Sequence, residues 1–233
     1  MPSVGVNLSV DKRLANNWLG GFSYTWSRLT GNCSGLAAAD EFGRVSPYVE
    51  RMFDNWAMAV TKDMSTLDGV LPTDRTHFFK FYGAYTFPFR LTIGTVLNAM
   101  SGVPFTETWP VLGAYFYPFS RGKERNGTTG NDIVSSRMPF LWFANAYAEY
   151  NLRLGKYTLN FNVNLDNVFN IATARRLIGD RALYGLGVDE DTILSGNWDL
   201  TSGDYGFVQS PLYKMKTDFY SPISVRFGMK FIF

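Results

Sequence analysis

The feature that most constrains the fold of this chain is a strict alternation of apolar and polar residues. In 157–166 every second residue from Leu159 is apolar, and the residues between are three asparagines and an aspartate. A period of two places the two sets on opposite faces of a β-strand. The same alternation, strict in some segments and interrupted in others, predicts seven strands. They are 4–10, 17–27, 77–87, 91–99, 142–152, 157–166 and 223–233.

The connections between these strands alternate between short and long. The short ones are 11–17, 88–90 and 153–156, and the long ones are 28–76, 102–141 and 169–217. Strands near the ~9–11 residues that cross a tilted bilayer, with short turns at one end and long loops at the other, are typical of outer-membrane barrels. Compact soluble domains favour short connections throughout. We therefore expect an all-β fold of antiparallel transmembrane β-barrel strands, with long extracellular loops and short periplasmic turns.

Composition excludes several other classes of protein. Aromatic residues make up 17% of the 233 residues and charged residues only 18%, which excludes a disordered chain. The most apolar region, 78–100, is interrupted by Lys80, Arg90 and Asn98, so no helical membrane span is expected. The net charge is +2 and the basic residues are scattered, which argues against a nucleic-acid partner. No secretory signal is visible in 1–7.

Trp18 and Trp26 lie on the apolar side of one predicted strand. Eight residues of tilted strand separate them by roughly 20 Å along a membrane normal. That distance is close to the ~25 Å apolar band between the two aromatic girdles of outer-membrane barrels. We therefore predict that Trp18 and Trp26 are membrane-interface aromatics, although two tryptophans buried in an ordinary core strand is an alternative.

Strand parity bears on the domain organisation. If the C-terminus is periplasmic, the last strand runs inward from the cell surface, and counting back makes the first strand run inward too. A bacterial barrel with a periplasmic N-terminus begins with an outward strand and has an even number of strands. We therefore expect 1–233 to be the C-terminal part of a larger barrel. The alternative is a complete small outer-membrane barrel, acting as an adhesin or structural pore, with an eighth strand in 45–60 or 181–194.

Several short motifs follow one another in order along the chain. They are Trp18, Trp26-Ser27-Arg28, Gly31-Asn32-Cys33-Ser34-Gly35-Leu36, Ser46-Pro47, Arg51 with Phe53-Asp54, Leu71-Pro72-Thr73-Asp74-Arg75-Thr76-His77, Ser101-Gly102 with Pro104, Arg137 with Pro139, and Asp166-Asn167-Val168-Phe169-Asn170. Their order and spacing resemble the C-terminal barrel region of TonB-dependent outer-membrane receptors. The resemblance is greatest to the Oar-like group, which has an N-terminal carboxypeptidase-regulatory-like domain. The family often has an aromatic residue where this chain has Cys33.

The resemblance implies a place for the chain in the bacterial outer membrane. It implies a barrel of about 22 strands, a size known for plugged outer-membrane transporters, whose loops bind a solute for uptake. The surroundings would be outer-membrane lipid and lipopolysaccharide. A plug domain and a TonB-contacting segment do not fit within 1–233, so contact with TonB is expected only through an N-terminal region absent from these residues.

The last eight residues resemble the signal that the barrel assembly machinery recognises. Arg226, Gly228, Phe231 and Phe233 fit its pattern of a polar residue, a glycine two positions later and a terminal phenylalanine. Such a signal is an edge strand offered for β-augmentation. We therefore expect the barrel assembly machinery to be a partner of this strand, although any sheet can end on a hydrophobic strand.

Few residues suggest chemistry. Asp189, Glu190 and Asp191 have the oxygen ligands that Ca²⁺ prefers, but a solvated acidic loop is favoured because no EF-hand pattern surrounds them. The single histidine, His77, is expected to hydrogen bond locally, and the single cysteine, Cys33, to be an inert loop residue. We expect no enzyme activity, because a Ser-His-Asp cluster has no convincing members here, and no cofactor or metal.

Two further segments of the chain have a functional and a structural interpretation. Arg175, Arg176 and Arg181 are candidates to contact lipopolysaccharide headgroups, and solvation in the loop is the alternative. Ser101-Gly102-Val103-Pro104 is interpreted as the exit from a strand, not as a nucleophile elbow.

Overall fold

Seven long strands form one antiparallel sheet in the computed structural model. They are β1 (Ser3–Ala15), β2 (Trp18–Gly31), β6 (His77–Thr86), β7 (Leu91–Met100), β12 (Leu141–Leu154), β13 (Tyr157–Asp166) and β16 (Ser224–Ile232). The structure describes residues 3–31, 37–39, 43–44, 68–71, 73–111, 114–116, 122–125, 133–195, 199, 201 and 203–233. The predicted all-β antiparallel fold is confirmed, and each of the seven predicted strands is present.

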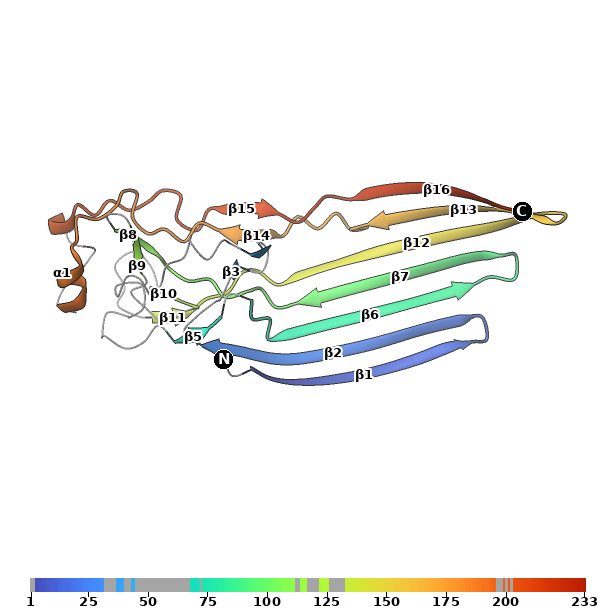
Figure 1. Ribbon diagram of the computed structural model, residues 1–233, viewed down its shortest axis with the longest axis horizontal. Coiled ribbons are helices and arrows are strands. Elements are labelled where there is room, and N and C mark those ends of the chain that lie inside the picture. Colours follow the sequence, from blue (N-terminus) through green and yellow to red (C-terminus); the bar gives the residue numbers. More distant parts are fainter. Residues whose placement is uncertain are drawn as a thin grey trace.

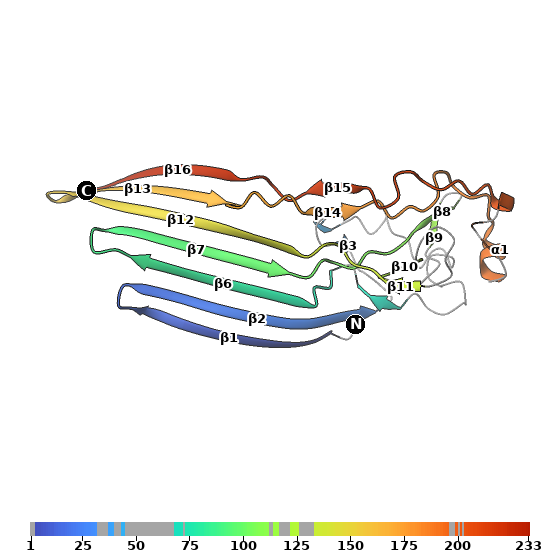
Figure 2. The same cartoon turned by 180° about the vertical axis from the view of Figure 1, so that it is seen from behind.

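Each long strand pairs with the next one along the chain. The order in the sheet is β1-β2-β6-β7-β12-β13-β16, and Figures 1 and 2 show these strands side by side. Among the described residues, no strand pairs with the outer edge of β1 or β16, so this sheet does not close on itself. The N-terminus lies at the end of the sheet that carries the long connections, and the C-terminus lies at the opposite end (Figure 1). The first and last strands therefore run in the same direction, as predicted.

Short turns connect three pairs of strands at one end of the sheet, which we call the short-turn end. β1 and β2 are joined by Asn16 and Asn17, with φ angles of 54° and 66°. Asparagine tolerates this left-handed region, and two such residues suit a tight hairpin turn. The predicted connection 11–17 was too long, because β1 continues to Ala15 through an irregularity in its register after Lys12. The other turns are 88–90 and 155–156.

The long connections gather at the opposite end, which we call the long-connection end (Figure 1). They contain short elements that alternation did not predict: β3 (Ala37–Ala39) with β4 (Gly43–Arg44), β5 (Gly69–Val70), β8 (Trp109–Val111) with β9 (Ala114–Phe116), β10 (Lys123–Arg125) with β11 (Ile133–Ser135), β14 (Ala174–Leu177) with β15 (Lys216–Phe219), α1 (Glu190–Ser195) and the 3₁₀ helix Gly203–Tyr205. No helix in the described part of the chain is long and apolar enough to cross a membrane.

Of the two candidate segments for an eighth long strand, the structure describes only one. Residues 181–194 form no strand and end in helix α1. The other candidate, 45–60, lies outside the described residues. Within the described ranges, the main sheet is extended by β5 alone, through two residue pairs with the end of β2.

Most of the buried apolar side chains lie in the long connections and not on the sheet. Trp109 and Leu186 are fully buried there. The others in these connections are Leu71, Val103, Phe105, Met138, Ala174, Ala182 and Val188. The long connections therefore have a packed core of their own, while the seven strands present two faces that remain largely uncovered.

Candidate functional site

One face of the seven-stranded sheet is apolar. The register aligns Val10, Phe22, Phe81 and Leu97 in one row across four strands. Many large apolar side chains on this face are exposed, and within the seven strands their exposed fractions run from 36% for Trp142 to 80% for Phe227. Its other exposed members include Val4, Val6, Leu8, Val10, Trp18, Phe22, Phe81, Tyr85, Ile93, Tyr150, Phe161, Val225, Met229 and Phe231. A soluble protein rarely exposes a patch of this extent.

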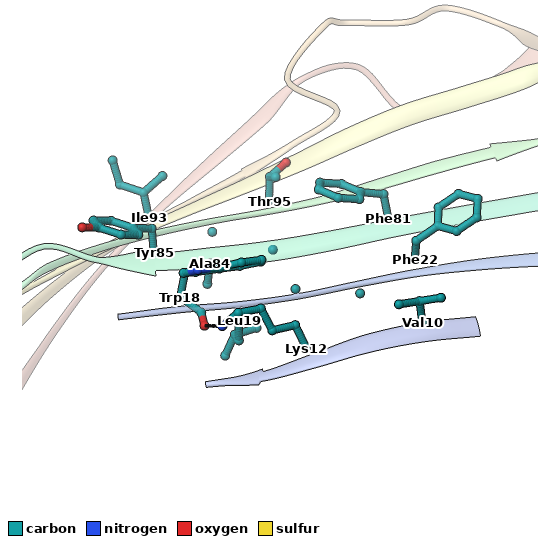
Figure 3. Close-up of a pocket in the computed structure, with 14 residues that line it drawn as sticks. Val10, Lys12, Trp18, Leu19, Phe22, Phe81, Ala84, Tyr85, Ile93 and Thr95 are labelled. Carbon is teal, nitrogen blue, oxygen red and sulfur yellow. Dashed lines mark hydrogen bonds between the residues drawn. The ribbon is translucent and has the colours of Figure 1, made fainter. Parts of the chain in front are cut away.

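A groove of about 690 Å³ crosses this apolar face. Figure 3 shows Phe22 and Phe81 beside each other toward one end of the groove and Tyr85 and Ile93 toward the other. Gly20 and Gly83 are paired across β2 and β6, and their missing side chains leave the space between these larger residues. The apolar face is therefore corrugated, with bulky side chains separated by hollows.

The opposite face carries a connected row of amides and acids. Asn151 and Asn160 both donate to Oε1 of Glu149, at 2.9 and 2.6 Å. The row continues along β13, where the Asn162 amide donates to Oδ1 of Asn160 at 3.3 Å and the Asn164 amide donates to Oδ1 of Asn162 at 3.4 Å. Because the strand alternates, these amides all lie on the face opposite Phe161. We call this surface the polar face.

Two glycines on the polar face make room for side chains from neighbouring strands. A Cβ atom at Gly21 would overlap Oδ1 of Asp11 and lie 2.6 Å from the Tyr82 ring. In the space that Gly21 leaves, the Tyr82 hydroxyl donates to Asp11 at 2.6 Å across β2. Gly228 similarly faces Asn162, whose Oδ1 would lie 2.6 Å from an added Cβ. A glycine inside a strand is the sequence signal for such close approach.

The predicted interface tryptophans lie toward opposite ends of the apolar face. Trp18 begins β2 beside the short turn, and the Lys12 amine lies 3.9 Å from the centroid of its ring. Trp26 is aligned with His77, at the long-connection end of the sheet. Further aromatic pairs flank each end: Tyr85–Phe87, Phe87–Phe89 and Tyr157–Phe231 by the short turns, and Tyr24–Phe79 and Trp142–Phe169 by the long connections. Contact with a membrane interface remains a prediction for these residues.

The sequence motifs converge where the strands pass into the long connections. Asp74, 2% exposed, accepts hydrogen bonds from the backbone N–H of Leu29 at 2.6 Å and from Nη2 of Arg137 at 2.6 Å. Nη1 of Arg137 donates to the carbonyl oxygens of Asp74 and Gly102. These contacts connect β2, the entrance to β6 and both ends of 101–140. The motif residues thus hold the long connections onto the sheet.

Gly102 is packed against the backbone at this junction. A Cβ atom at this position would overlap the carbonyl group of Met138 and lie 2.7 Å from the carbonyl oxygen of Pro139. The backbone N–H of Met138 donates to Val103 O at 2.8 Å. Because β7 ends at Met100, the interpretation of 101–104 as the exit from a strand is confirmed.

The late motif 166–170 forms a second junction. Asn167, 2% exposed, has a left-handed φ of 52°. Its amide donates to the carbonyl oxygens of Ile171 and Ser221, at 3.1 and 2.8 Å. Asn170 accepts from the backbone N–H of Ile223 at 3.0 Å. The motif therefore connects the end of β13 to the segment that leads into β16.

Arg181 lies in the core of the long connections. Both expectations for it, contact with lipopolysaccharide headgroups and solvation in the loop, are therefore wrong. Its guanidinium is 3.5 Å from Oε2 of Glu107, and both side chains are buried. Glu107 also accepts from the indole N–H of Trp109 at 2.7 Å and from the Tyr213 hydroxyl at 3.1 Å. Arg181 therefore does not face a headgroup or solvent. Arg175 is half-buried and Arg176 is exposed.

The remaining candidates have local roles or lie outside the described residues. The Tyr24 hydroxyl and His77 Nδ1 are 2.9 Å apart, and the backbone N–H of His77 donates to the hydroxyl of Ser101. Asp189 precedes α1 and accepts from the N–H of Thr192 at 2.8 Å, and hydrogen bonds from Thr192 lower the pKa of Asp189. Within the described residues, no group of three His, Cys, Asp or Glu side chains forms a metal site. Cys33 lies outside the described residues.

β16 presents the predicted assembly signal on both faces of the sheet edge. Arg226 lies on the polar face and pairs with Asp166 at 2.8 Å, and Gly228 is on the same face. Phe231 and Phe233 lie on the apolar face, 53% and 93% exposed. Recognition of these four residues by assembly machinery remains a prediction.

Comparison with known proteins finds a distant relative. The TonB-dependent transporter Oar of Myxococcus xanthus is 27% identical to the chain over 173 residues. The match covers 71% of the chain but 15% of that protein, so the chain spans only a small part of the length of this relative. No family profile and no solved structure matches the chain. The chain is distantly related to a TonB-dependent transporter.

Proposed function

We propose that this chain forms part of the wall and the extracellular loops of a β-barrel in the bacterial outer membrane, within a TonB-dependent receptor or transporter. The observation that carries the proposal is the exposed apolar face, which extends across all seven strands while the opposite face bears amides and charges. Lipid outside and a wet lumen inside require this division of side chains. The distant relationship to a TonB-dependent transporter supports the same assignment.

The proposal makes the chain a segment of a larger barrel. In a bilayer, an open sheet edge leaves backbone N–H and C=O groups without partners, at a cost of several kcal/mol for each group. The outer edges of β1 and β16 are open in the described structure. Further strands of the intact protein would pair with both edges. A small barrel of these strands alone would instead require β1 to pair with β16.

Within the barrel, the proposal divides the work of uptake between two regions. The packed core around Glu107 and Trp109 makes the long connections a structured platform for a solute at the cell surface. The polar face lines the lumen, through which the solute passes. Contact with TonB belongs to a region outside these residues.

The proposal is tested by fractionating cells that produce the intact protein. The protein should be recovered with outer membranes, require detergent for extraction, and migrate differently on gels before and after heating. Heat-modifiable migration indicates a folded barrel that resists detergent. Recovery in the aqueous fraction as a detergent-free monomer would contradict the proposal.

Replacing Phe233 with alanine is expected to lower the amount of folded protein in the outer membrane several-fold. Phe233 is 93% exposed and lies 6.2 Å, centroid to centroid, from Phe231, so its removal costs little packing. A large effect would therefore come from lost recognition of the edge strand during assembly. The measurement is the heat-modifiable fraction of the protein in isolated outer membranes.

Phe89→Ala is the matched control, because Phe89 is another exposed aromatic at the short-turn end, 58% accessible. It should leave the folded amount close to wild type. Equal amounts of folded Phe233→Ala and Phe89→Ala protein would refute the proposed role of the terminal phenylalanine.

A further inference from the structure

A pocket of about 420 Å³ lies at the long-connection end of β2, distinct from the groove on the apolar face. Alternate residues of β2, Trp26, Arg28 and Thr30, line it, so it opens on the side of the sheet that carries the apolar face. Ser135 and Arg137 come to it from the connection 101–140. The sheet and the long connections therefore build this pocket together.

The described lining of the pocket carries one positive charge that no described carboxylate balances. The charge of Arg137 is balanced by Asp74 at 2.6 Å, and this ion pair holds the guanidinium in place. Arg28 is exposed, and no described residue forms an ion pair or side-chain hydrogen bond with it. None of the described residues that line the pocket is acidic. Within this part of the structure, an anion entering the pocket would therefore meet Arg28 without a competing carboxylate.

The polar groups around Arg28 suit a phosphorylated sugar. A guanidinium binds phosphate oxygens through paired, charge-assisted hydrogen bonds. The hydroxyl groups of Thr30, Ser135 and Ser136 also line the pocket, and hydroxyls both donate to and accept from sugar hydroxyls. Arg137 donates two hydrogen bonds from Nη1 and one from Nη2 to Asp74 and Gly102. These contacts use three of the five N–H donors of its guanidinium.

The position of the pocket selects a lipid as the source of that sugar. Trp26 lines the pocket and also belongs to the apolar face, which continues along β2 through Tyr24 and Phe22. We propose that the pocket binds the phosphate-bearing sugar headgroup of an outer-leaflet glycolipid, whose acyl chains lie on the apolar face beyond Trp26. This inference rests on the proposed function, because it requires the apolar face to be in a membrane.

The test uses the intact protein, purified from outer membranes in mild detergent, with retained lipopolysaccharide measured by mass spectrometry and fatty-acid analysis. Arg28→Gln should reduce the retained glycolipid about tenfold, as expected for the loss of a charge-assisted contact. Ser135→Ala should cause a smaller loss, of about threefold. The matched control is Arg153→Gln, since Arg153 is an exposed arginine at the short-turn end and should retain the wild-type amount.

The outcomes separate this inference from the proposed function. Wild-type protein absent from outer membranes would contradict the proposed function itself. Folded Arg28→Gln protein that retains as much glycolipid as wild type would overturn only the pocket. If Arg28→Gln does not fold, an unchanged amount of glycolipid on Ser135→Ala would overturn it. Delipidated protein that binds glucosamine 1-phosphate as tightly as lipopolysaccharide would overturn the lipid source.

Discussion

Replacing Gly102 with alanine is expected to destabilise the folded protein by about 3 kcal/mol, as for overpacking at a site that cannot relax. The added methyl group would overlap the carbonyl of Met138, and Pro139 O would be 2.7 Å away. These are backbone atoms, so no side-chain rotation relieves the overlap. The same segment supplies Arg137 to Asp74, and a shift of the backbone would also disturb this ion pair.

The measurement is the midpoint of urea unfolding of the intact protein in detergent, followed by heat-modifiable migration. Gly187→Ala is the matched control, because apart from its two chain neighbours no atom of the described residues lies within 4 Å of a Cβ built at Gly187. The control should unfold at the wild-type midpoint. If Gly102→Ala also unfolded at the wild-type urea midpoint, the close approach of the backbone at Gly102 to that at Met138 would be refuted.

Replacing Val10 with arginine is expected to cost about 2–4 kcal/mol in a bilayer, the range measured for arginine at the midplane of a barrel's lipid face. Val10 is 73% exposed and aligned with Phe22, midway between Trp18 and Trp26 along β2. In water, an arginine at such an exposed position would cost almost nothing. The size of the effect therefore reports on the solvent that this face contacts.

Ser9→Arg is the control, one residue away in the same strand. Ser9 is exposed and is aligned with Ser23 on the polar face. We expect its unfolding free energy in lipid vesicles to stay within about 0.5 kcal/mol of wild type. Equal tolerance of arginine at Val10 and Ser9 would contradict the assignment of the two faces.

The strands could be predicted because their pattern is local. The limits of β13, Tyr157–Asp166, coincide with the predicted ones. A period of two needs no knowledge of which strand lies next to it. The turn at Asn16-Asn17 was the exception, although the paired asparagines were a signal that a two-residue hairpin turn was available.

The core of the long connections could not be predicted in the same way. Glu107 and Arg181 lie far apart in the sequence and meet only because 101–140 and 170–215 pack together. Nothing in their neighbouring residues distinguishes a buried arginine from an exposed one, so Arg181 was wrongly expected to contact lipopolysaccharide or solvent. Burial of a charged side chain depends on its partner, and that partner is non-local.

The junction residues fall between these two cases. The motifs around Asp74, Gly102 and Arg137 stood out in the sequence through their resemblance to a family, without a physical role for each residue. The structure supplies that role, because Arg137 bonds to Asp74 and to the carbonyl oxygen of Gly102. The glycine at 102 is explained by the space that the Met138 backbone occupies.

If alternate residues of each strand face lipid and water, strand β13 should show this most directly, because its alternation is strict. With Cys33 replaced by serine, spin labels are attached to single cysteines at Phe161, Asn162, Val163 and Asn164 of the intact protein in vesicles. Oxygen, which concentrates in lipid, should relax the labels at 161 and 163, and a water-soluble nickel complex should relax those at 162 and 164. Labels at all four positions that respond alike to oxygen and nickel would contradict the assignment of alternate residues to lipid and water.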